Sequence, residues 1–187
     1  MIERNNKKID VKKMTYLAIF TALVVVLQTV FAPLIGAATG LSPALVLIPI
    51  VLGVSICGLG AGAWLGAVFS FIVMFDPTTV PFLQFNPLAT VFLVFLKGMG
   101  SGIIAGLVFK LIEKKNRYVA IFTAALLAPI ANTGIFVLGC YAFFLDLTGI
   151  GIYSLFITVN FAVELAINVV LVPIIYRVLQ IAERKSI

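Results

Sequence analysis

Residues 88–112 read LATVFLVFLKGMGSGIIAGLVFKLI, an apolar run with Lys97 near its middle and Lys110 near its end. About 20 apolar residues cross the hydrocarbon core of a bilayer, so this run predicts a transmembrane helix. A second apolar run, residues 152–176, carries Glu164 in the same way. A charge at the bilayer centre costs about 2.5–3.5 kcal/mol even on lenient scales. Both side chains must therefore face a protein interior or a wet cavity, which makes them the first candidates for function.

The composition places the whole chain in a membrane. Its 187 residues are 63% hydrophobic and 11% charged, with a mean hydropathy of +1.22, far from the values of a soluble domain. We expect one membrane domain, residues 1–187, and no enzyme. The absence of histidine excludes His-ligated zinc and Ser-His-Asp catalysis, and no Walker A motif is present. Cys57 and Cys140 are isolated in apolar runs and are expected to be core residues. We predict no cofactor and no metal site.

The apolar runs predict an all-α bundle of six transmembrane helices. The run over residues 42–75 is too long for one crossing of a ~30 Å core at about 1.5 Å per residue. We therefore split it at residues 57–62, CGLGAG, which can form a tight turn. The predicted spans cover residues 14–35, 42–57, 61–75, 87–112, 118–144 and 152–176.

The basic residues test this division into spans. With six spans, both termini and the loop at residues 113–117 lie on one side. That side then holds all of the 13 basic residues except Lys97, whereas the other side holds Asp76 and Asp146. This agrees with the positive-inside rule, so both termini are predicted to be cytoplasmic. The net charge of +6 then indicates contact with anionic lipid rather than with nucleic acid.

Two series of glycines four residues apart predict close helix packing. They are Gly58, Gly62 and Gly66, and Gly98, Gly102 and Gly106.

The predicted outer loop at residues 76–87, DPTTVPFLQFNP, is too rich in proline for a helix. It either rests on the membrane surface or forms a lid over a site that opens outward. In the second case Gln84 and Asn86 are expected to contact the ligand.

Several polar side chains are expected to converge near mid-membrane. Asn160, Glu164 and Asn168 recur every four residues and share one helix face, and Thr90 and Lys97 share another. Asn132 follows Pro129 near the middle of its own helix. A structural ion pair between Lys97 and Glu164 would not require the amides, so a polar ligand site is favoured.

The first predicted helix carries Ala18 and Ala22 close to its cytoplasmic end. Small residues four apart allow another helix to lie against this face, either within the bundle or from a partner.

These features together resemble the substrate-binding S component of energy-coupling factor (ECF) vitamin transporters. The resemblance covers nearly the whole chain and includes the basic N-terminus, the AxxxA first helix and the Gly-rich turn between two short helices. It implies that Ala18 and Ala22 dock on a transmembrane coupling subunit, which works with two ATPases. It also implies that a vitamin binds in the outward half of the bundle. The implied contacts are Lys97, Asn132, Asn160, Glu164, Asn168, Thr90, Gln84 and Asn86.

A lysine that points into the site suggests an anionic ligand. Pantothenate, with one carboxylate, one amide and two hydroxyls, fits best, and the segment ANTGIF, residues 131–136, resembles pantothenate S components. Riboflavin is the alternative, since Asn and Lys could also serve its ring system and ribityl chain. Two other classes stay open: a proton-coupled carrier that uses Glu164, and an assembly subunit without a ligand.

Overall fold

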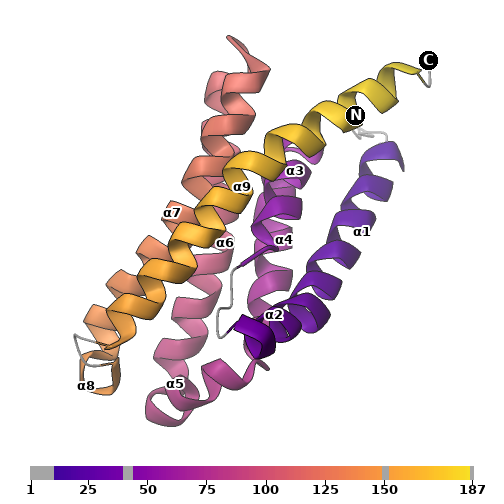
Figure 1. The fold of residues 1–187 in the computed structure, drawn as a ribbon. Coiled ribbons are helices and arrows are strands. Elements are labelled where there is room, and N and C mark those ends of the chain that lie inside the picture. Colours follow the sequence, from indigo (N-terminus) through magenta and orange to yellow (C-terminus); the bar gives the residue numbers. More distant parts are fainter. Residues whose placement is uncertain (1–10, 40–43, 149–151, 186–187) are drawn as a thin grey trace, which may run out of the picture.

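The computed structural model describes residues 11–39, 44–148 and 152–185, and within these ranges every regular element is a helix. Figure 1 shows the long helices side by side. The elements in chain order are α1 (Val11–Val26), the π-helical segment η1 (Leu27–Phe31), α2 (Ala32–Thr39), α3 (Leu47–Cys57), α4 (Leu59–Val73), the 3₁₀ turn η2 (Pro77–Thr79), α5 (Val80–Phe85), α6 (Pro87–Ile112), α7 (Arg117–Phe143), α8 (Leu145–Thr148) and α9 (Ile152–Lys185).

The all-helical prediction is confirmed for the described part of the chain, and the apolar lengths support a multi-pass membrane protein. Four helical stretches are long and apolar enough to cross a bilayer: Val11–Ala38, Pro87–Ile112, Arg117–Phe143 and Val159–Ile181. The pair Leu59–Val73 and Pro77–Phe85, bent by 78°, adds a fifth if it counts as one span. The helix Leu47–Cys57 is apolar but shorter, so a count of six spans stays a prediction.

The chain breaks between α3 and α4 at a single residue. Gly58 has a φ of 93°, a left-handed conformation that residues with a Cβ rarely adopt, and its N–H caps α3 by donating to the carbonyl of Val54. The predicted turn at residues 57–62 is therefore shorter in the structure, since α4 already begins at Leu59.

The glycine series bring α4 and α6 into backbone contact. A Cβ on Gly66 would clash with the carbonyl of Gly98, and one on Gly62 would clash with that of Gly102. The close approach also lets the Ser70 hydroxyl donate to the Val94 carbonyl across the two helices, at 2.9 Å. These contacts fix α6 in the centre of the bundle, where it also packs against α7 (Figure 1).

The proline-rich segment after α4 is a helix, contrary to the prediction for residues 76–87. Pro77 and Pro81 both occupy the first turn of their helices, η2 and α5. The first turn requires no N–H donor from these positions, so proline is tolerated there. Asp76 caps η2 by accepting from the N–H of Thr78 at 2.9 Å. The sequence prediction had treated proline as a helix breaker without regard to its position.

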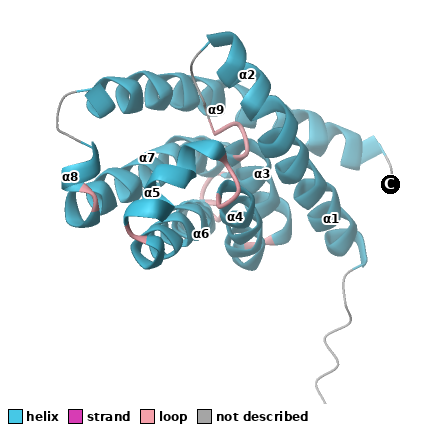
Figure 2. Cartoon of the chain, turned by 90° about the horizontal axis from the view of Figure 1, so that it is seen from below, coloured by secondary structure: helices cyan, strands magenta, loops and turns pink. Residues whose placement is uncertain are grey.

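The two ends of the bundle differ. The start of α1, the α6–α7 turn and the end of α9 lie at one end, which we call the basic end, whereas α2, α5 and α8 lie at the other (Figure 1). Figure 2 views the molecule from the end that carries α5. The short α3 is buried over most of its length and starts only at Leu47, so it fills the core toward the basic end and leaves room near α5.

Candidate functional site

A cavity of about 410 Å³ lies in the half of the bundle toward α5, where α3 does not reach. Its polar lining comes from the five elements η1, η2, α6, α7 and α9: Gln28, Asp76, Thr78, Thr79, Thr90, Lys97, Asn132, Asn160 and Glu164. Its apolar lining includes Phe69, Phe82, Phe136 and Phe144. The volume falls in the range of about 300–1,000 Å³ that is typical of small-molecule sites.

Lys97 enters the cavity from α6 without a conventional partner. Its ammonium nitrogen lies 4.6 Å from the centre of the Phe136 ring, a cation–π contact. It forms no hydrogen bond and no ion pair with any residue in the described ranges. A cation–π contact contributes about 0.5–2 kcal/mol and leaves all three ammonium donors unused. Lys97 is therefore available to a ligand acceptor.

Glu164 reaches the same cavity from α9 and is only 4% exposed. Its Oε2 accepts from the N–H of Ala44 at 3.4 Å, and its Oε1 accepts from the amide of Asn132 at 3.5 Å. Both bonds are long for a carboxylate, whose charge-assisted bonds are usually about 2.7–2.9 Å. The carboxylate is held in place but retains capacity to accept from a ligand hydroxyl.

Asn132, on α7, supplies both a donor and an acceptor beside Glu164. Its amide donates to the carboxylate, whereas its Oδ1 is buried and has no hydrogen-bond partner among the described residues. A buried acceptor without a partner costs about 1–3 kcal/mol. A ligand N–H or O–H would satisfy it.

Five of the eight residues predicted to contact a ligand line the cavity: Thr90, Lys97, Asn132, Asn160 and Glu164. Asn168, Gln84 and Asn86 lie outside its lining. Asn168 is fully buried and donates to the backbone carbonyl of Glu164 at 2.9 Å, so it supports the helix that carries this carboxylate. Gln84 is exposed on α5. Asn86 caps α6 by accepting from the N–H of Ala89.

The sequence analysis missed two parts of the lining. Gln28 is 8% exposed and lines the cavity from η1, and its amide makes no hydrogen bond with a described residue. A π-helical turn often marks a functional position, but nothing in the sequence predicts this one. Asp76, Thr78 and Thr79 close the cavity from η2. A lid was one of the two predictions for their segment, the other being a segment that rests on the membrane surface, and the residues named as contacts were Gln84 and Asn86.

The two residues predicted to dock on a partner lie away from this cavity. Ala18 and Ala22 are both exposed on α1, whereas Phe20 and Val24 of the same helix are buried in the core. The two alanines therefore form part of an outward face.

The fold and the cavity define a multi-pass membrane protein with an internal site of ligand size. The family model of the ECF transporter, substrate-specific component, matches residues 12–176, and the chain belongs to this family. Its members bind a small-molecule substrate and associate with an ECF module; they are transporter subunits rather than enzymes. No significant match to the chain was found among curated proteins or among solved structures.

Proposed function

We propose that this subunit captures pantothenate from outside the cell and delivers it through an ATP-driven coupling module. The observation that carries the choice of an anionic vitamin is Lys97, a cation inside the cavity with no acceptor in the described structure. The pantothenate carboxylate would supply that acceptor and neutralise the charge.

The rest of the lining suits the rest of this ligand. Glu164 can accept from a hydroxyl, the free Oδ1 of Asn132 can accept from the ligand amide N–H, and Gln28 can pair with either group. The phenylalanine rings offer an apolar wall to the branched dimethyl part. Polar groups that fix orientation within an apolar wall are typical of small-molecule sites.

Riboflavin stays the alternative ligand because four phenylalanines line the cavity and could stack on its ring system. Trp64 would not contribute, since it is 54% exposed and donates to Thr21 outside the cavity. Riboflavin is neutral, however, and would leave Lys97 without a counter-charge.

A proton-coupled carrier is the alternative class. It is favoured by the burial of Glu164, because an isolated carboxylate inside a membrane protein is a common proton site. The chain belongs to the ECF substrate-specific component family, which favours the role of a binding subunit over that of a carrier.

The proposal includes a topology. The basic end would face the cytoplasm of a cell-membrane protein with six spans, α3 and α4 forming the short pair, and the cavity end would face outward. The exposed Ala18 and Ala22 would then dock on the transmembrane coupling subunit, which two ATPases drive.

Calorimetry on the purified chain tests the ligand. Pantothenate should bind with one site per chain, and riboflavin, folate, biotin, thiamin and cobalamin should bind more weakly or not at all. Flat titrations with all six vitamins, on protein that is folded and monodisperse, would contradict the binding-subunit proposal. If only riboflavin binds, riboflavin rather than pantothenate is the ligand of this subunit.

A further inference from the structure

Two further cavities adjoin at the basic end, far from the residues of the proposed vitamin site. One, of about 200 Å³, is lined by α1, α3, the start of α7 and α9. The other, of about 340 Å³, lies between α1, the α3–α4 turn, α6 and the α6–α7 turn. Both are lined by Lys13, Ser55, Ile56 and Arg117. Neither has a role in the proposed vitamin binding.

The charged residues described in the lining of these cavities are mostly basic. Lys110 comes from α6 and Arg117 from α7, beside Lys12 and Lys13 of α1, and among the described residues Glu113 supplies the one carboxylate of the lining. Like charges from three separate helices repel one another. The fold nevertheless holds them around one pair of hollows, which favours an anion there.

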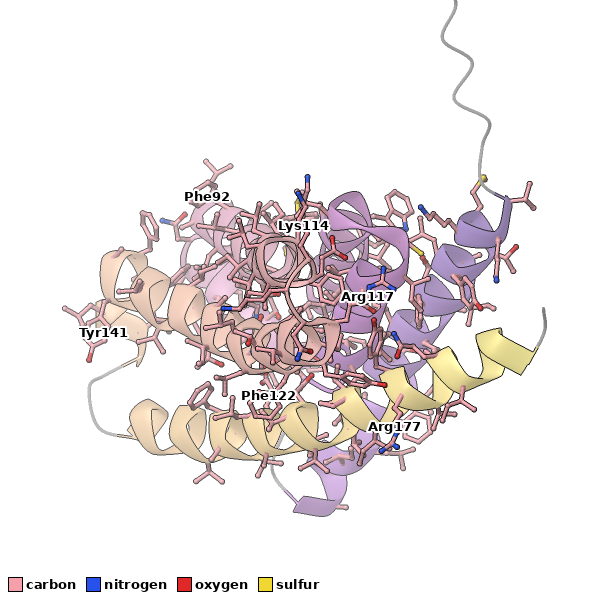
Figure 3. The ribbon with its side chains drawn as sticks, turned by 90° about the horizontal axis from the view of Figure 1, so that it is seen from above. Phe92, Lys114, Arg117, Phe122, Tyr141 and Arg177 are labelled. Carbon is pink, nitrogen blue, oxygen red and sulfur yellow. The ribbon has the colours of Figure 1, made fainter. Side chains whose placement is uncertain are left out.

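Arg117 is the best placed of these residues to recognise an oxyanion. It is the first residue of α7 and forms no hydrogen bond or ion pair with a described residue. Figure 3 looks onto this end and shows Arg117 over the interior of the bundle, whereas Arg177 lies on the outer side of α9. A guanidinium presents paired donors that match phosphate oxygens, and it remains charged at every physiological pH.

The remaining lining of the smaller cavity combines hydroxyl-bearing and apolar side chains. Tyr16, Ser55 and Tyr176 contribute hydroxyls, and Ile56 and Leu179 contribute apolar walls. Tyr176 accepts a hydrogen bond from the amide of Gln180 at 2.9 Å, which leaves its own O–H to donate. A free phosphate would leave the apolar walls uncovered, whereas the glycerol and upper acyl carbons of a lipid would cover them.

We propose that the adjoining cavities at the basic end bind a phosphate-bearing anion, and that its source is the headgroup of an anionic phospholipid. Basic pockets between membrane helices on the cytoplasmic side are suited to such headgroups. The phosphate of the bound lipid would contact Lys110 of α6 and Arg117 of α7, and the lipid would connect the first turn of α1 to the start of α7 and to α9.

Native mass spectrometry of the purified chain with dioctanoyl-phosphatidylglycerol and dioctanoyl-phosphatidylcholine tests this proposal. Wild-type protein should retain phosphatidylglycerol in preference. The double variant Lys13→Gln with Arg117→Gln should weaken that binding about 30-fold, as expected for two basic residues near an anionic lipid. The matched control is Lys114→Gln with Arg177→Gln, which removes the same charge from exposed positions at the same end that line neither cavity.

Titration with inorganic phosphate distinguishes the two sources of the anion. If phosphate displaces phosphatidylglycerol only at high concentration, the lipid is the ligand. If the wild-type protein binds phosphate as tightly as it binds phosphatidylglycerol, the site exists but its ligand is a free anion. Arg117→Gln alone, at an exposed position, should weaken lipid binding about fivefold and serves if the double variant is unstable.

Equal losses of lipid binding in the two double variants would overturn the proposal, because the attraction would then be diffuse. Wild-type protein without a preference for phosphatidylglycerol would overturn it as well.

Discussion

The ammonium nitrogen of Lys97 lies 4.6 Å from the centre of the Phe136 ring, on the helix next to its own. Glu164, which lines the same cavity from α9, is bound by Ala44 and Asn132 instead of by the lysine. Lys97 and Glu164 are thus held separately by different neighbours. This arrangement differs from a structural ion pair and leaves the lysine available for a ligand.

Lys97→Met should abolish or strongly weaken pantothenate binding. Truncating one partner of a desolvated charge pair costs about 2–5 kcal/mol, or roughly 30-fold to several-thousand-fold in affinity. Calorimetry measures the change, and Lys110→Met, at the exposed end of the same helix, is the matched control. Unchanged affinity in Lys97→Met would remove the argument for an anionic ligand, and pantothenate with it.

The double variant Lys97→Met with Glu164→Leu separates stability from binding. If the two residues were a structural pair, Lys97→Met alone would leave a buried charge unpaired, and the double change would restore both melting temperature and binding. We expect that the double variant does not recover binding, because the lysine itself contacts the ligand. Thermal unfolding and calorimetry on the same samples distinguish the two results.

Glu164→Gln should weaken binding less than Lys97→Met does, because the amide still accepts from a ligand hydroxyl. A loss of about 0.5–1.5 kcal/mol, near that of one hydrogen bond, is expected. Uptake into vesicles that contain the whole transporter should fall in parallel with binding. Uptake that is abolished while binding persists would instead favour a proton-carrying role for this carboxylate.

Gln28→Ala should lower the affinity for the vitamin about fivefold, the effect of one lost hydrogen bond of ~1 kcal/mol. The control is Thr29→Ala, since Thr29 is exposed and its hydroxyl bonds only to the carbonyl of Val25 in its own helix. The Thr29→Ala control should bind the vitamin with wild-type affinity, as measured by calorimetry. Equal affinities for the two variants would show that the π-helical turn does not present a ligand contact.

Gly66→Ala should destabilise the bundle by about 1–3 kcal/mol, the usual cost of overpacking, because the new Cβ would meet the backbone of Gly98. Gly134→Ala is the comparison, since a Cβ there meets nothing within 4 Å. That change should be neutral or stabilise α7, as alanine favours a helix by about 0.5–1 kcal/mol over glycine. Thermal unfolding in detergent measures both, and a stable Gly66→Ala variant would contradict the packing of α4 on α6.

Ala18→Leu or Ala22→Leu should block co-purification with the coupling subunits while vitamin affinity stays unchanged. Both alanines are exposed on α1, away from the cavity lining. Ala37→Leu, which enlarges an exposed alanine of α2, should leave co-purification intact. Transport that survives both α1 substitutions would show that the docking face lies elsewhere.

The sequence by itself determined the helical class, the placement of Lys97 and Glu164 inside the bundle, and the close packing of the glycine series. Each follows from local rules: the length of an apolar run, the cost of a charge in hydrocarbon, and the absence of a side chain at spacing four. The same rules placed a break near Gly58, because only glycine adopts its backbone conformation easily.

The tertiary structure decided which polar side chains meet. Helical periodicity shows that Asn160, Glu164 and Asn168 share a face. It does not show which part of that face a neighbouring helix covers. In the structure, Glu164 lines the cavity, whereas Asn168 is fully buried and lies outside its lining. Gln28 enters the lining from a π-helical turn, where the chain departs from the 3.6-residue period that a sequence reading assumes. Asp76 becomes part of the site only because η2 and α5 fold back across the end of the bundle, which no local rule determines.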